Sequence, residues 1–189
     1  MKIVQFAECV YQWLNDHKRP VVPLLQKGLE LSEVMNFTDE LNITLTNELV
    51  ELYKWRNGTD KSDGYILGDV DFFPGYHFLP LEHSVAYYKS FINDRRWSKN
   101  WFPVFANGGG DFFIINCTDK FKESSEVIGF MRDFDDHEVE YLSLERMLQT
   151  FCECYTKGAF YLNGNGDIES KVEEEAIISN KLNPGLDRW

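Results

Sequence analysis

The stretch WFPVFANGGGDFFIINC, residues 101–117, carries the clearest fold signal in the sequence. Two short runs of aromatic and β-branched residues are joined by Asn-Gly-Gly-Gly at 107–110, a pattern that predicts a β-hairpin whose turn needs positive φ angles. A phosphate-binding loop would instead open a helix and continue into Lys and Ser or Thr, which are absent here. We therefore expect Gly110 to have a structural role, by adopting the backbone conformation that the turn needs, and Asp111 to stabilise the turn by accepting backbone N–H bonds.

Helical patterns lie on both sides of this hairpin. Apolar residues at helical spacing predict helices near residues 3–17, 31–41, 47–57, 82–92 and 143–157. Thr46 and Ser143 are suited to be N-caps, and Asn57-Gly58 to be a C-cap. Short strands are expected in the aromatic stretch 65–81 and near 126–134.

The order of these elements predicts an α+β fold, with a mixed, largely antiparallel β-sheet flanked by helices. We expect a single domain over residues 1–162, with the helices 47–57 and 143–157 packed on the sheet. Residues 163–189 form a polar, acidic tail. It is expected to be either a loose helix packed through Ile177 and Ile178 or a mobile end.

The charge of the chain limits the classes of partner. The 31 acidic residues outnumber the 19 basic ones, which gives a formal net charge of -12. Such a surface repels nucleic acids and anionic lipids, and it suits a basic partner or simply solubility. We expect a monomer. No apolar run approaches the length of about 20 residues that crosses a bilayer, and the N-terminal stretch lacks the pattern of a signal peptide. The prediction is a cytoplasmic protein.

The four cysteines are Cys9, Cys117, Cys152 and Cys154, and none forms a C-x-x-C pair. Cys152 and Cys154 are two residues apart in a predicted helix, so they face different directions and cannot readily share a zinc ion. We expect free thiols in a reducing compartment.

The densest acidic run is DFDDHEVE, residues 133–140. A second acidic group, Asp63, Asp69 and Asp71, flanks the aromatic pair Phe72-Phe73. Acidic and aromatic groups together are typical of an interface, where aromatics anchor and carboxylates select. The alternative is that the acids form solvated loops and the aromatics belong to the core.

An enzyme is the competing class of protein. Its best case is a metal site made by the carboxylates of 133–140 with His137. However, no second cluster of ligands completes a cage, the four histidines are scattered, and no recognised catalytic motif is present. We therefore expect no catalytic residue, no metal and no cofactor.

Three segments follow one another in a recognisable order: LTNELVELYKWRNG (45–58), FLPLEHSVAYY (78–88) and the hairpin 101–117. Together they resemble the SUKH superfamily, whose members include bacterial immunity proteins and a yeast regulator of cell-wall assembly. The resemblance covers about residues 30–157. It departs at Leu45-Thr46, where the family has Leu-Pro, but threonine can still begin a helix.

The resemblance implies an immunity protein that binds and blocks one cognate toxin, often a nuclease or deaminase. It also implies that Trp101, Gly110 and Asp111 serve the fold, while the partner surface varies between members. The acidic residues then become the candidates for contact with a basic toxin domain: Asp69, Asp71, Asp133, Asp135, Asp136 and Glu138. The alternative is a non-enzymatic regulatory or scaffold module, as the yeast relative suggests.

Overall fold

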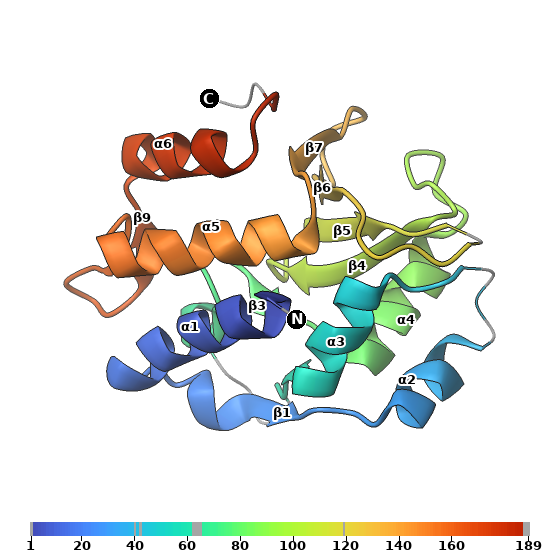
Figure 1. Cartoon of the computed structure of the whole chain (residues 1–189), viewed down its shortest axis with the longest axis horizontal. Helices are drawn as coiled ribbons and strands as arrows, with labels where there is room; N and C mark the ends of the chain where they lie inside the picture. Colours follow the sequence, from blue (N-terminus) through green and yellow to red (C-terminus); the bar gives the residue numbers. More distant parts are fainter. Residues whose placement is uncertain (1, 40, 42, 62–65, 119, 187–189) are drawn as a thin grey trace.

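A five-stranded antiparallel sheet lies at the centre of the molecule (Figure 1). The computed structural model describes residues 2–39, 41, 43–61, 66–118 and 120–186. The strand order is β3-β4-β5-β6-β7, and every pair is antiparallel. The strands are β3 (His77–Phe78), β4 (Trp101–Ala106), β5 (Phe112–Asn116), β6 (Val127–Phe130) and β7 (Glu138–Tyr141). Two short antiparallel pairs are separate from this sheet: β1 (Leu25–Lys27) with β2 (Arg56–Thr59), and β8 (Phe160–Leu162) with β9 (Ile168–Ser170).

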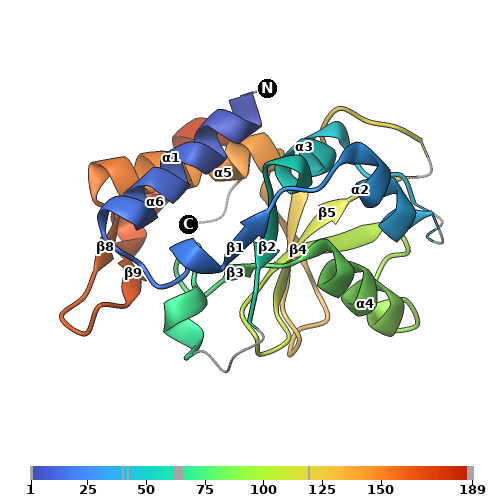
Figure 2. The same cartoon turned by 90° about the horizontal axis from the view of Figure 1, so that it is seen from below.

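Helices cover both faces of the sheet (Figure 2). They are α1 (Lys2–Asp16), α2 (Leu31–Thr38), α3 (Asn47–Trp55), α4 (Leu81–Phe91), α5 (Leu144–Lys157) and α6 (Val172–Leu182), with 3-10 turns η1 (Val22–Leu24) and η2 (Leu67–Val70). The predicted α+β class is confirmed. Among the described residues, no helix is both long and apolar enough to cross a membrane.

Alternation along β5 divides the core in two. Ile115 belongs to the larger cluster, with the apolar faces of α1, α3 and α5, and Phe113 packs against it. Phe112 and Ile114 belong to the smaller cluster, under α4. Because neighbouring residues in a strand point to opposite faces, one aromatic-rich strand serves both layers. In α5 the apolar residues recur on one stripe, which is why this helix packs along its whole length.

The predicted hairpin is confirmed: β4 and β5 pair antiparallel, from Trp101 opposite Asn116 to Ala106 opposite Phe112. Gly108 and Gly110 have φ angles of 78° and 108°. Both lie in the region that favours glycine, as the sequence predicted.

The prediction that Asn57-Gly58 caps a helix is wrong. α3 ends at Trp55, and the Asn-Gly pair lies in β2. The side chain of Asn57 accepts a hydrogen bond from the backbone N–H of Leu81 at 2.9 Å, so it serves the start of α4. Gly58 has a φ of 69°, and a Cβ there would lie 2.2 Å from the backbone nitrogen of Pro80. Close contact with a distant segment therefore explains this glycine.

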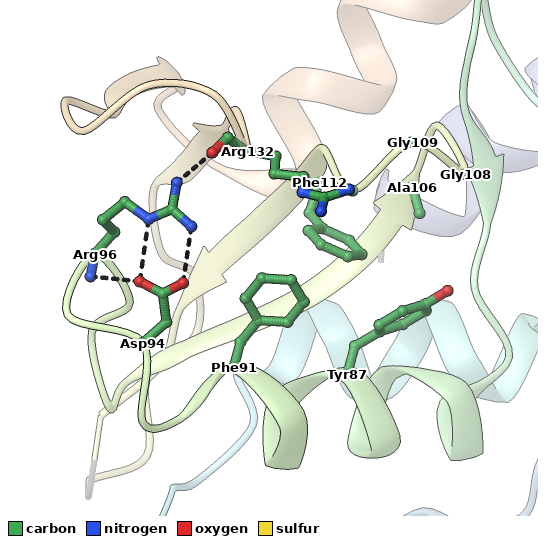
Figure 3. Close-up of a pocket in the computed structure, with 10 residues that line it drawn as sticks. Tyr87, Phe91, Asp94, Arg96, Ala106, Gly108, Gly109, Phe112 and Arg132 are labelled. Atoms are coloured by element: carbon green, nitrogen blue, oxygen red, sulfur yellow. Dashed lines mark hydrogen bonds and ion pairs between the residues drawn. The ribbon is translucent and has the colours of Figure 1, made fainter.

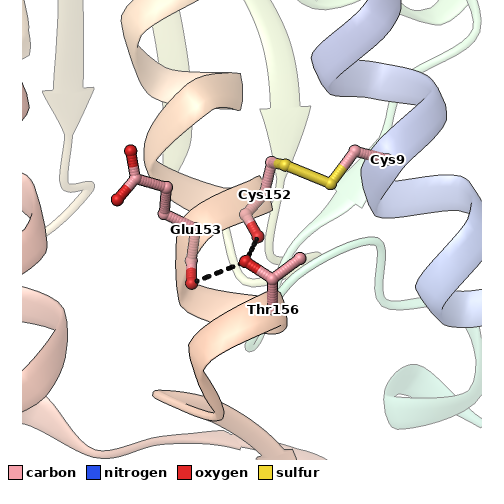
Figure 4. Close-up of a disulfide and its surroundings, with 4 residues drawn as sticks. All are labelled: Cys9, Cys152, Glu153 and Thr156. Atoms are coloured by element: carbon pink, nitrogen blue, oxygen red, sulfur yellow. Dashed lines mark hydrogen bonds between the residues drawn. A yellow bond between two sulfur atoms is a disulfide. The ribbon is translucent and has the colours of Figure 1, made fainter.

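The prediction of four free thiols is also wrong, because Cys9 of α1 and Cys152 of α5 form a disulfide (Figure 4). Their Cα atoms are 5.7 Å apart although 143 residues separate them along the chain. The two helices pack side by side, which spacing within the sequence does not reveal. Cys117 and Cys154 are free and buried. Disulfides are characteristic of oxidising compartments, so the cytoplasmic location stays a prediction.

Residues after the predicted domain limit at 162 continue the structure. The β8-β9 hairpin spans that limit, and α6 lies along α5 (Figure 1). In α6, Ile178 and Leu182 are buried whereas Ile177 is 71% exposed. The buried Asn183 accepts a hydrogen bond from the backbone N–H of Leu142 at 3.1 Å, and this bond joins the end of α6 to the start of α5.

Candidate interaction surface

The turn between β4 and β5 is organised by the side chain of Asn107. Its Oδ1 accepts the backbone N–H groups of Gly109, at 2.7 Å, and Asp111, at 3.1 Å. Its Nδ2 donates to Oδ2 of Asp111 at 2.6 Å. Two N–H groups that could cradle a phosphate are therefore already used inside the turn, which favours the structural interpretation of the glycines.

Gly110 and Asp111 also hold the segment that follows β6. Oδ1 of Asp111 accepts the backbone N–H of Arg132 at 2.8 Å. A Cβ on Gly110 would lie only 2.8 Å from Cδ of Arg132, so the glycine lets the arginine stem pack across it. The expected N–H bond to Asp111 thus exists, but it comes from the segment that follows β6 rather than from the turn itself.

Arg96 fixes the same segment from the other side. Its guanidinium donates to the backbone oxygen of Arg132 and forms an ion pair with Asp94 at 2.8 Å. Hydrogen bonds from Arg96 hold the pKa of Asp94 at about 2. Both backbone groups of Arg132 are therefore bound, the N–H by Asp111 and the C=O by Arg96.

Residues 131–137, which join β6 to β7, are called the acidic loop from here on. Asp133, Asp135 and Asp136 are exposed, as is Glu138 at the start of β7. Asp135 pairs with Arg95 at 3.2 Å, but both side chains are mostly exposed and such a pair contributes little.

The acidic loop also exposes two large apolar side chains. Phe134 is 61% exposed and Met131 is 45% exposed. Aromatic residues and methionine are enriched in protein interfaces relative to the rest of the protein surface. The sequence interpretation centred on the carboxylates and missed Phe134, although it lies between Asp133 and Asp135.

His137 does not face the carboxylates as a metal ligand would. Its ring stacks 4.4 Å from that of Phe130 and lies edge-on to Trp101 at 5.7 Å. Burial lowers the pKa of His137. Among the described residues, no group of three or more His, Cys, Asp or Glu side chains is placed to hold a metal ion.

Trp101, the third predicted fold residue, is half-buried at the start of β4. Its ring contacts His137 and Trp97 and packs against the smaller core cluster. Trp101, Gly110 and Asp111 thus all lie around the base of the acidic loop.

The second acidic group lies elsewhere. Asp69 and Asp71 are half-buried near η2, close to the buried Arg19, which donates to the backbone oxygens of Gly68 and Gly166. Asp71 accepts the N–H of Gly75 at 3.1 Å, and burial raises the pKa of Asp71 to about 6. Asp63 lies outside the described residues.

The aromatic pair next to this second group is core. Phe72 is fully buried and Phe73 is 3% exposed, and both belong to the larger cluster. The acidic-aromatic interface expected at 69–73 therefore has no exposed aromatic, whereas the acidic loop has one. The structure does not bring the two acidic groups together. The acidic loop leads through β7 to the N-terminal end of α5. Arg19, which lies close to Asp69 and Asp71, instead contacts Gly166 in the β8-β9 turn, which follows the C-terminal end of α5 (Figure 1).

A comparison with models of known protein families finds a match to the SMI1 / KNR4 family (SUKH-1) over residues 28–150. This range covers more than half of the chain. The protein belongs to the SUKH-1 family. A comparison with curated proteins finds no match.

The matched region of this SUKH-1 protein contains the whole central sheet, from β3 to β7, and the acidic loop. The first helix, α1, lies before it, and the β8-β9 hairpin and α6 lie after it. Both cysteines of the disulfide are also outside the matched residues. The disulfide thus attaches an N-terminal helix to the part of α5 that extends beyond the SUKH-1 module.

Proposed function

We propose that this SUKH-1 protein is an immunity protein, which binds one cognate bacterial toxin and neutralises it by covering a basic active cleft. Membership of the SUKH-1 family supports the proposal. The acidic loop is the surface that we propose contacts the toxin. The role is binding, without catalysis, cofactor or metal, by a monomer. Nucleic acids and membranes are not its partners, because the net charge of -12 repels both.

The acidic loop has the chemistry that a basic cleft requires. Asp133, Asp136 and Glu138 are exposed and have no ion-pair partner among the described residues. Carboxylates that compete with a polyanionic substrate for a basic cleft raise the association rate and select the partner. Phe134 supplies an exposed ring that a partner can bury, as the anchors of interfaces do.

The loop is also held in place before a partner arrives. Asp111 and Arg96 bind the two backbone groups of Arg132, next to the first of the acids. A fixed base lowers the conformational entropy that binding must offset. Under this proposal the fold residues Gly110 and Asp111 contribute to recognition indirectly, by positioning the loop.

The experiment is co-expression with the toxin encoded beside this protein, scored as survival of the cells. Asp136→Lys with Glu138→Lys should abolish protection while the melting temperature stays unchanged. The matched control is Asp16→Lys with Glu173→Lys, which changes the net charge equally at exposed acids on α1 and α6. It should protect as well as the wild type.

Survival that is equally poor with and without the wild-type protein would overturn the immunity proposal. The regulatory or scaffold module would then take its place. Protection that both double variants retain would leave immunity standing but would remove the acidic loop from it.

A further inference from the structure

A pocket of about 410 Å³ lies beside the acidic loop, and neither the fold nor the proposed function uses it. It is bounded by the last turns of α4, the 94–96 segment, the β4-β5 turn and Arg132. Figure 3 shows Tyr87 and Phe91 rising from α4 toward Phe112, with the side chain of Arg132 coming from the opposite wall. The volume is within the range of sites that hold small ligands.

The floor of the pocket is aromatic and fixed. The ring of Phe112 lies 5.0 Å from that of Tyr87 and 5.4 Å from that of Phe91. Phe112 is 2% exposed and belongs to the smaller core cluster, so the floor is anchored in the sheet. The half-buried rings of Tyr87 and Phe91, which rest on this floor, offer faces and edges against which another aromatic ring can pack.

In the part of the chain that the structure describes, the wall of the pocket carries one available positive charge. Arg96 is fully engaged, because it binds both oxygens of Asp94 and the backbone oxygen of Arg132. The guanidinium of Arg132, in contrast, has no hydrogen-bond or ion-pair partner among the described residues. Its stem is held against Gly110, where a Cβ would come within 2.8 Å of Cδ. The charge is therefore presented at the pocket by a supported side chain.

We propose that this pocket binds a small aromatic monocarboxylate. The ring of the ligand packs against Tyr87 and Phe91, and its carboxylate accepts paired N–H bonds from Arg132, the geometry that guanidinium favours. The carboxylate of Asp94 also lines the pocket, where it is paired with Arg96, so the local field disfavours a second negative charge on the ligand. This selects a monoanion over a phosphate ester or a dicarboxylate.

The test is a titration of the isotope-labelled protein, followed by amide NMR shifts, with phenylacetate as the probe. Phenylacetamide has the same ring without the charge, and acetate has the charge without the ring. Phenylacetate should shift the amides of residues 108–112 and 132 and bind about tenfold more tightly than either partial probe. Equal affinity for phenylacetate and phenylacetamide would overturn the proposal, as would shifts that map elsewhere or no binding at all.

Two variants separate the role of Arg132 from general electrostatics. Arg132→Gln should weaken phenylacetate binding about tenfold and leave the binding of phenylacetamide unchanged. Arg95→Gln removes an equal charge from a neighbouring exposed arginine that pairs with Asp135 and does not line the pocket. It should bind phenylacetate like the wild type. If the two variants lose equal affinity, the pocket assignment is wrong.

Discussion

Reduction of the Cys9–Cys152 disulfide should destabilise the protein strongly. The bond closes a loop of 143 residues, for which the chain-entropy model gives about 5 kcal/mol at 25 °C. Losses measured when native disulfides are removed are about 2–5 kcal/mol. For a chain of this length each kcal/mol changes the melting temperature by about 2–4 °C, so we expect a decrease of roughly 5–20 °C.

The fold should survive the loss, because Ile3, Ala7, Val10 and Leu14 of α1 remain fully buried against the core. The perturbed segment should be α1, which is then held to α5 by packing alone.

The assay is thermal unfolding followed by circular dichroism, with and without a phosphine reductant. The variant Cys9→Ser with Cys152→Ser provides the control: it should melt like the reduced wild type and ignore the reductant. Hydrogen exchange should show faster exchange in α1 of this variant. Four reactive thiols in unreduced, denatured protein would show that the disulfide does not form, and an equal effect of reductant on both proteins would show that it does not stabilise the fold.

Four further outcomes are expected. Gly110→Val should cost about 1–3 kcal/mol because φ is 108° there, whereas Gly164→Val, at an open position, should cost far less in the same melts. Asp111→Ala should lose about 1–2 kcal/mol in urea unfolding through the hydrogen bonds that it accepts. Burial raises the pKa of Glu48 from 4.5 to about 7, so the folded state binds the extra proton and stability falls as pH rises through that window. Glu48→Gln keeps an acceptor for the N–H of Leu144 and should lack this fall. In urea unfolding, the wild type should therefore lose up to about 3 kcal/mol more stability than the variant between pH 4.5 and pH 8. Added Mg²⁺, Mn²⁺ or Zn²⁺ should leave the melting temperature unchanged, because a specific site would raise it.

The local signals in the sequence were sufficient for the hairpin and for the helices α1 to α5, whereas α6 was left open between a loose helix and a mobile end. The aromatic runs on either side of 107–110 and the N-cap residues Thr46 and Ser143 specify their own elements. β7 was missed because it lies within the acidic run. There the buried Glu140 hides the alternation that would have marked a strand.

What the sequence could not provide was contact between distant segments. Asn57-Gly58 looks like a helix end, but its environment is set by Pro80 and Leu81. The Cys9–Cys152 pair depends on two helices that pack side by side.

The same limit applied to the candidate site. The exposure of the acids in the loop was expected from their charge, whereas the engagement of Asp111 with Arg132 and the half-burial of Asp69 and Asp71 require the fold. The exposure of Phe134 could have been predicted, because acidic residues flank it on both sides in the sequence.

The central claim is that the acidic loop of this SUKH-1 protein binds a basic toxin domain. The most direct measurement is the association rate with the purified, catalytically inactive toxin domain as a function of salt, for the wild type and for Asp136→Lys with Glu138→Lys. We expect the wild-type association rate to fall about tenfold or more between low and high salt, with a smaller change in the dissociation rate. The variant should associate slowly at all salt concentrations. Absence of binding by the wild type, or rates that are independent of salt and equal in the two proteins, would contradict the central claim.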